Sequence, residues 1–172
     1  MYQTTPDPCP EQGTLFPTAR PAVHRPYRVP IYRVTLVREA NVTLTQPQIR
    51  SSRDAAVVFR QHLGDVDREH FLVAMLDTKN KLIGLNTVSV GSLNASVVHP
   101  REVFKPAILA NANTILLAHN HTSGAPAPSQ EDRLLTRKLV LAGEALGIKV
   151  MDHIIVGDGT TSYFSFADEG LL

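Results

Sequence analysis

The segment HNHTSGAPAPSQED constrains the fold of this chain more than any other part of it. It begins with His119 and His121 directly after an apolar run, ILLA, which predicts a strand. A loop rich in proline, glycine and serine comes next, followed by Ser129 and, three residues later, Asp132. A serine with an acid at that spacing, before an apolar periodic segment, indicates the start of a helix. The segment therefore predicts a strand, a loop and a helix that returns beside the strand.

The same residues are placed to bind a metal ion. Residues two apart in a strand point to the same side, so the imidazoles of His119 and His121 can face one point just past the strand's end. Asp132 falls in the first turn of the following helix, where the chain comes back beside the histidines. Two histidine nitrogens and one carboxylate oxygen, with a fourth position open, are typical ligands of a catalytic zinc. We therefore expect one Zn²⁺ per chain, held by His119, His121 and Asp132.

Composition sets the class of protein without identifying it. A chain of 172 residues with 43% apolar content can bury one core, so a single domain is the starting expectation. The 17 basic and 16 acidic residues give a formal net charge of +1, which argues against a protein that relies on binding phosphate groups, although a local basic patch stays possible. No apolar run approaches the roughly 20 residues of a membrane-spanning helix. The first residues lack the layout of a signal peptide, so we expect a soluble cytoplasmic protein with no membrane contact.

The beginning of the chain differs in composition from the rest. Residues 1–28 contain six prolines and few aliphatic side chains, which predicts a flexible N-terminal arm. Residues 29–37 (VPIYRVTLV) alternate between apolar and polar, which predicts a strand at a sheet edge, near a proline. We therefore place the folded domain at residues 29–172.

The remaining segments alternate between helical and strand patterns. Helices are predicted at residues 53–63, 100–111 and 131–146, and strands at residues 71–76, 81–90, 114–118, 150–156 and 162–166. In the last helix, the predicted core stripe is Leu135, Leu139, Ala142 and Leu146. This order predicts an α/β fold, a sandwich of helices around a mixed central β-sheet.

A zinc hydrolase also needs a base that takes a proton from the attacking water. The candidates are Glu69, Glu102, Glu131 and His153. Glu69 is favoured because it immediately precedes a buried strand, at a sheet edge where a carboxylate is poorly solvated. Glu131 neighbours Asp132 but should point about 100° away around the helix.

These residues resemble a known family. The spacing of His119, His121, Ser129 and Asp132 is similar to the JAMM (MPN+) metalloprotease motif. The surrounding segments resemble the bacterial RadC branch over roughly residues 52–172, namely EHFLVAMLDTKNKLIG, GSLNASVVHPREVFKPAILANANTILLAHNHTSG, PSQED and GIKVMDHIIVGDGTTSYFSFADEGLL. Several separate segments in the expected order make the resemblance specific.

The resemblance implies the JAMM fold, a cytidine deaminase-like α-β-α sandwich. It implies a zinc held by His119, His121 and Asp132, with Ser129 beside the substrate carbonyl. The acid just before the first core strand is the general base in JAMM enzymes, and Glu69 matches that position. The implied activity is hydrolysis of a peptide or isopeptide bond in a peptide or protein conjugate.

Three departures from the family pattern matter. RadC proteins usually have HNHPSG, and here Thr122 replaces the proline, so the loop loses a rigid φ but no ligand. Asn120 lies between the histidines, as in RadC proteins, where JAMM proteases commonly carry serine or threonine. The helix-hairpin-helix module of full-length RadC proteins has no counterpart in the sequence, which weakens an expectation of direct DNA binding.

Alternative interpretations stay open at this point. A DNA-metabolism accessory protein could keep the zinc site and act through partners, and a scaffold could keep the fold without activity. An HNH nuclease is disfavoured, because its residues spread over a much longer unit and its surface is more basic.

The single residues also have alternative roles. Ser129 could be only a helix cap, Asp132 could only favour the helix dipole, and Glu69 could be a polar linker residue. We expect a structural role for His153, with contact to the metal ligands as the alternative. Asn120 could position substrate or only the loop. Substrate identity and oligomeric state stay undetermined.

Overall fold

The computed structural model describes residues 29–41, 43, 48–64, 66–91 and 98–172. The predicted flexible arm, residues 1–28, lies outside the described residues. The helices and strands follow one another in the order α1 (Ser52–Leu63), β1 (His70–Leu76), β2 (Leu82–Val90), α2 (Pro100–Leu109), β3 (Thr114–His121), α3 (Gln130–Leu146), β4 (Lys149–Gly157) and β5 (Tyr163–Ser165). Among the described residues, no helix is long and apolar enough to cross a membrane.

One mixed sheet organises these elements. Its strand order is β2-β1-β3-β4-β5, so β3 lies in the centre. β3 and β4 are parallel and are connected through α3, whereas the other neighbouring strands are antiparallel. A parallel pair needs such a crossover, which is why the predicted loop and helix follow β3 directly.

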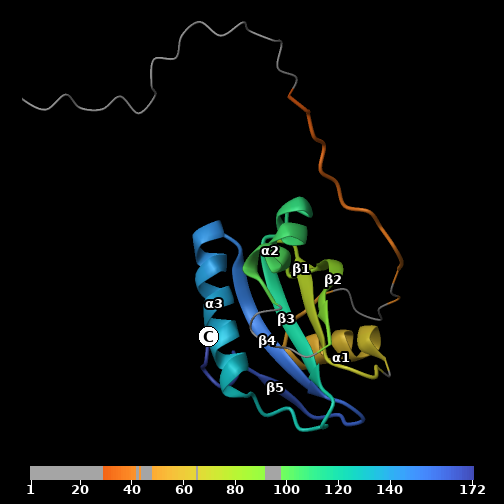
Figure 1. Cartoon of the computed structure of the whole chain (residues 1–172). Coiled ribbons are helices and arrows are strands. Elements are labelled where there is room, and N and C mark those ends of the chain that lie inside the picture. Colours follow the sequence, from red (N-terminus) through yellow and green to blue (C-terminus); the bar gives the residue numbers. More distant parts are fainter. Residues whose placement is uncertain (1–28, 42, 44–47, 65, 92–97) are drawn as a thin grey trace, which may run out of the picture. The chain divides into compact units, whose positions relative to one another are not determined.

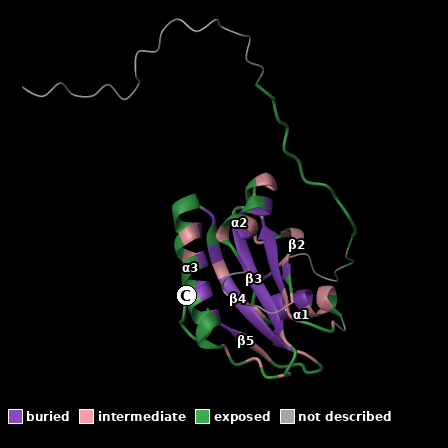
Figure 2. Cartoon of the chain, viewed as in Figure 1, coloured by how far each residue is buried: buried purple, intermediate pink, exposed green. Residues whose placement is uncertain are grey.

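The helices cover both faces of the sheet. Phe71, Val73 and Met75 of β1 pack with α2 and α3 in one core cluster, and the alternate residues Leu72 and Ala74 pack with α1 in the other. Figure 1 shows α3 and α1 on opposite sides of the sheet. The strands between them are largely buried, as the purple ribbon in Figure 2 shows. The structure confirms the predicted α/β sandwich.

The helix boundaries follow from residues that the sequence shows. Ser51 caps α1, because its side chain accepts a hydrogen bond from the backbone N–H of Asp54. Ser129 caps α3 in a capping box with Asp132. Gly147 ends α3 with a φ of 69°, a left-handed conformation that favours glycine.

Three local predictions were wrong. The described residues 29–37 form no strand: the sheet ends at β2 and β5, and Ile31 is 99% exposed. An alternating segment becomes a strand only where a neighbour satisfies its backbone groups. β3 runs on through His121 instead of ending at Ala118, so both histidines lie within the strand. Leu146 is exposed at the end of α3, and Gly143 is buried against Phe104 instead.

Candidate metal centre

Three of the predicted site residues converge on the face of the sheet that α3 covers. His119 and His121 come from β3, and Asp132 comes from the first turn of α3. The Nε2 atoms of the two histidines are 3.1 Å apart. The Asp132 carboxylate has Oδ1 3.2 Å from His119 Nε2 and Oδ2 3.5 Å from His121 Nε2. His119 is fully buried, and Asp132 is 6% exposed, so little water competes for these atoms.

The hydrogen bonds of His121 assign its tautomer. Its Nδ1 lies 2.8 Å from the carbonyl oxygen of Ala125 in the loop that follows β3. A carbonyl oxygen can only accept a hydrogen bond, so Nδ1 of the neutral ring carries the proton. The lone pair of His121 is therefore on Nε2, the atom that faces His119 and Asp132.

A longer chain of hydrogen bonds assigns the tautomer of His119. The Thr136 hydroxyl donates to the backbone carbonyl of Asp132 at 2.6 Å, so it accepts a hydrogen bond from Nδ1 of His153, also at 2.6 Å. His153 then has its lone pair on Nε2, which accepts from Nδ1 of His119 at 2.9 Å. The remaining lone pair of His119 is on Nε2. In their neutral forms, both histidines thus direct an unprotonated nitrogen into the same space.

This arrangement fits a small divalent cation that binds nitrogen. Two lone pairs that face each other beside a carboxylate cannot form hydrogen bonds among themselves, because all three groups are acceptors. A cation can bind all three. Tetrahedral zinc with ligands at about 2.0–2.1 Å places neighbouring ligand atoms about 3.3 Å apart. The three separations of 3.1, 3.2 and 3.5 Å lie around that value. Within the described residues, these are the side chains that could hold a metal ion as a group of three or more.

The charges of the cluster also favour a cation. Burial alone would raise the pKa of the Asp132 carboxyl, but the two imidazoles and the Ser129 hydroxyl hold that pKa well below its usual range. The Asp132 carboxylate raises the pKa of His121 above its usual value, with smaller contributions from the Ala125 carbonyl and Glu69. Burial keeps the pKa of His153 well below its usual value. The ionised Asp132 carboxylate thus attracts positive charge to this point, which a proton on His121 or a bound cation in its place can supply.

Ser129 holds Asp132 in place. Its hydroxyl donates to Oδ2 of Asp132 at 2.6 Å, and its backbone N–H donates to the same oxygen at 2.8 Å. The hydroxyl also accepts from the backbone N–H of Asp132 at 3.1 Å. The helix cap therefore fixes the carboxylate that faces the histidines.

Glu69 lies directly before β1, which is paired antiparallel with β3. The last pair in that register is Phe71 with His119, and extending it by two residues places Glu69 opposite His121. Directly opposed residues share a face of the sheet, so Glu69 belongs to the face that carries the candidate metal ligands. Its contribution to the raised pKa of His121 agrees with that placement.

The other candidate bases lie in different settings. Glu102 is on α2, where it forms an ion pair with Lys105, and Glu131 is exposed on the first turn of α3. His153 contacts His119 directly, so the favoured expectation of a purely structural role was incomplete. The sequence does not single out Thr136, because its contact with His153 joins α3 to β4 across the packed layers.

The hydrogen bond from His153 to Thr136 gives a testable prediction. Thr136→Val keeps the shape of the side chain but removes the acceptor for His153 Nδ1–H, so nothing holds the tautomer of His119. Losing the direct partner of a metal-bound histidine typically weakens binding about 10- to 100-fold, and we expect the lower end of that range because Thr136 acts on His119 through His153. We expect that loss of zinc affinity in a competition titration with a chromophoric chelator. Thr136→Ser retains the hydroxyl and should bind as the wild type does. Equal affinities for Thr136→Val and Thr136→Ser would contradict the tautomer assignment.

The loop after His121 is packed closely against the end of β4. Gly157 pairs with His121, and a Cβ at Gly157 would lie 2.1 Å from the carbonyl oxygen of Gly124. Gly157→Ala must therefore move the loop that orients His121, which we expect to cost about 2–3 kcal/mol of unfolding free energy. Gly159→Ala is the control, because it meets no atom within 4 Å and carries only the strain of a φ of +65°, about 1 kcal/mol. Urea unfolding of both variants measures the difference, and equal losses would refute the packing argument.

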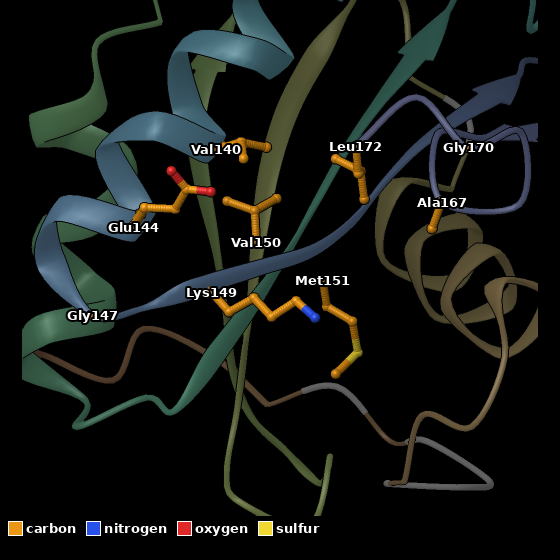
Figure 3. Close-up of a pocket in the computed structure, with 10 residues that line it drawn as sticks. Val140, Glu144, Gly147, Lys149, Val150, Met151, Ala167, Gly170 and Leu172 are labelled. Atoms are coloured by element: carbon orange, nitrogen blue, oxygen red, sulfur yellow. The ribbon is translucent and has the colours of Figure 1, made fainter.

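A pocket lies elsewhere in the molecule (Figure 3). It is lined by the later part of α3, the start of β4 and the C-terminal segment, with Glu144 and Lys149 among apolar side chains such as Val140, Val150 and Leu172. None of the three metal-ligand candidates lines it. The candidate metal centre therefore remains the candidate functional site.

Comparison with known proteins gives one consistent result. Residues 49–171 match the family model described as the RadC-like JAB domain. The chain is 53% identical to a UPF0758 protein of Moorella thermoacetica over 122 residues, which is 71% of this chain and 53% of the relative. It is 50% identical to a UPF0758 protein of Rubrobacter xylanophilus over 127 residues, covering 74% of this chain and 55% of the relative. A UPF0758 protein of Methanosarcina acetivorans is 44% identical over 139 residues, covering 80% of this chain and 60% of the relative. The chain thus spans a little over half the length of these curated relatives.

Proposed function

Because the chain belongs to the RadC-like JAB domain family, we propose that it is a zinc-dependent hydrolase of the JAMM class that cleaves a peptide or isopeptide bond. The observation that supports this function is the convergence of three unprotonated ligand atoms on one buried point. His119 and His121 each direct a lone pair there, and Asp132 adds an ionised carboxylate. Three protein ligands, with a fourth position left for water or substrate, are typical of catalytic rather than structural zinc.

The residues around that point can carry out hydrolysis. Bound by the three ligands, zinc would supply Lewis acidity and lower the pKa of a water molecule. Glu69 would accept a proton from the attacking water while the water oxygen bonds to the carbonyl carbon of the substrate. Glu69 would then return that proton to the amine nitrogen as the C–N bond breaks, which leaves a carboxylic acid and an amine.

Ser129 is proposed to stabilise the oxyanion that forms on the carbonyl oxygen of the substrate. It is exposed at the start of α3, next to Asp132, so a substrate can reach it. Its hydroxyl proton lies on the hydrogen bond to Asp132 Oδ2. The role therefore requires the hydroxyl to turn from Asp132 towards the substrate, and a hydroxyl that does so supplies a donor where negative charge develops.

An activity screen tests the proposed function. The zinc-loaded full chain is incubated with libraries of linear peptides and of isopeptide-linked conjugates, and Glu69→Gln serves as the inactive reference. We expect cleavage of at least one class by the wild type alone. Absence of cleavage, combined with sub-micromolar binding of duplex DNA that weakens steeply with salt, would favour the DNA-metabolism accessory role instead.

A further inference from the structure

Asn120 lies between the two histidines of β3, so strand alternation directs its side chain to the opposite face of the sheet. It is fully buried. Its Oδ1 accepts a hydrogen bond from the backbone N–H of His70 at 2.7 Å. Its Nδ2 donates to the backbone carbonyl of Arg68 at 3.1 Å and to Oδ2 of Asp158 at 2.9 Å. One amide group therefore joins β3 to the first residue of β1, to the segment just before β1 and to the turn after β4.

Two of these partners lie on either side of Glu69. The carbonyl of Arg68 and the N–H of His70 both face β3, and the same Asn120 amide binds both. The intervening carbonyl of Glu69 faces β2, where it accepts from the N–H of Gly91 at 2.8 Å. Hydrogen bonds to β3 and to the end of β2 thus hold the backbone around Glu69. They do so even though Glu69 lies outside the paired residues of β1 and β3.

Asparagine suits this position for a chemical reason. The site needs one acceptor, for an N–H, and two donors, for a carbonyl and a carboxylate, and a primary amide carries both kinds of group. An aspartate would place its charge against the Arg68 carbonyl and the Asp158 carboxylate. Serine or threonine has a single proton to donate and could not serve both acceptors.

We infer that Asn120 is a positioning residue, which sets the place of Glu69 relative to the metal ligands. The inference rests on the proposed function, in which Glu69 is the base. Strand β3 supplies His119 and His121 on one face and the anchor of Glu69 on the other. The distance between ligands and base is then fixed by a single strand, and misplacement of a reacting group by about 1 Å can cost about a hundredfold in rate.

The first test compares two variants of the zinc-loaded full chain. Asn120→Ala removes all three hydrogen bonds, including the two that flank Glu69, whereas Asp158→Ala removes only the third and is the matched control. We expect kcat to fall at least about tenfold in Asn120→Ala, with bound zinc and KM unchanged, and less than about threefold in Asp158→Ala. Equal effects of the two variants, or loss of zinc from Asn120→Ala alone, would overturn the inference.

A double variant shows whether Asn120 acts through Glu69. In a Glu69→Gln background there is no base left to position, so adding Asn120→Ala should lower kcat no further. Loss of thermal stability alone would not produce this non-additivity. An additional fall as large as the one in the wild-type background would show that Asn120 affects turnover by another route.

Hydrogen exchange tests the positioning without reference to activity. We expect the His70 amide to exchange at least about tenfold faster in Asn120→Ala than in wild type or Asp158→Ala. The amide of Leu117, in the middle of β3, should keep its protection and so report an intact sheet. Unchanged protection of His70 would overturn the inference even if activity fell. Conversely, a wild type without hydrolytic activity but with this exchange pattern would refute the proposed function and leave the anchoring of the segment established.

Discussion

Glu69→Gln should retain zinc and lose at least about a hundredfold in kcat, because an amide cannot accept the proton of the attacking water. General acid–base catalysis typically contributes about 10²- to 10⁴-fold, which sets the size of the loss. Glutamine keeps the length of the side chain, and the backbone of Glu69 is held by Asn120 and Gly91, so the fold should not change. Steady-state kinetics on the best substrate of the screen, with zinc measured in the same sample, gives the result.

Glu131→Gln is the matched control for this variant. Glu131 precedes the candidate metal ligand Asp132 in sequence but is exposed on the first turn of α3. We expect its kcat to stay within about threefold of wild type, since a base must lie within hydrogen-bond reach of the proton it takes. Full activity of Glu69→Gln, or a large loss in Glu131→Gln, would show that the base has been assigned to the wrong residue.

Replacing His119 and His121 together with alanine should abolish zinc binding and its effect on stability. A ligand present at about 100 times its Kd stabilises the folded state by about 2.7 kcal/mol. For a chain of this size, that corresponds to a rise in Tm of about 5–10 °C on adding zinc. We expect that rise in the wild type and none in the double variant, as measured by thermal unfolding in chelator and in excess zinc.

His99→Ala is the control for nonspecific binding of zinc by histidine. His99 is exposed before α2 and makes no capping hydrogen bond with its side chain. The Tm of His99→Ala should therefore rise on adding zinc by as much as the Tm of the wild type. A zinc-dependent rise in Tm that survives in the double variant would mean that the stabilising ion binds elsewhere.

The sequence predicts the parts of this structure whose causes are local. Ser129 and Gly147 bound α3 through capping and left-handed conformations that depend on neighbouring residues only. The continuous apolar runs in β1 and β3 predict the buried strands. The three ligand candidates could be predicted because a strand, a loop and a helix cap, all continuous in sequence, bring them together.

The wrong predictions share a different origin. Residues 29–37 have the alternation of a strand, but alternation cannot show whether a neighbouring strand is present. β3 was predicted to end before its polar residues, yet His119 and Asn120 are both fully buried. Their partners are His153, 34 residues later, and Arg68, 52 residues earlier, so only tertiary structure makes their burial favourable.

The surroundings of the candidate site were the least predictable part. Thr136 and His153 belong to α3 and β4, and no sequence spacing indicates that they support the tautomer of His119. The position of Glu69 beside His121 follows from the antiparallel register of β1 and β3, which the strand patterns do not specify. The sequence predicts the candidate ligands, and the structure adds the hydrogen-bond network around them.

The number of zinc ions bound per wild-type chain is the most direct test of the metal site. The chain is stripped with chelator, titrated with zinc in competition with a chromophoric indicator, and analysed by native mass spectrometry. We expect one zinc per chain, bound more tightly than by the indicator, because two histidine nitrogens and a carboxylate already face the same point. A folded chain that takes up no zinc under these conditions would contradict the assignment of this metal site.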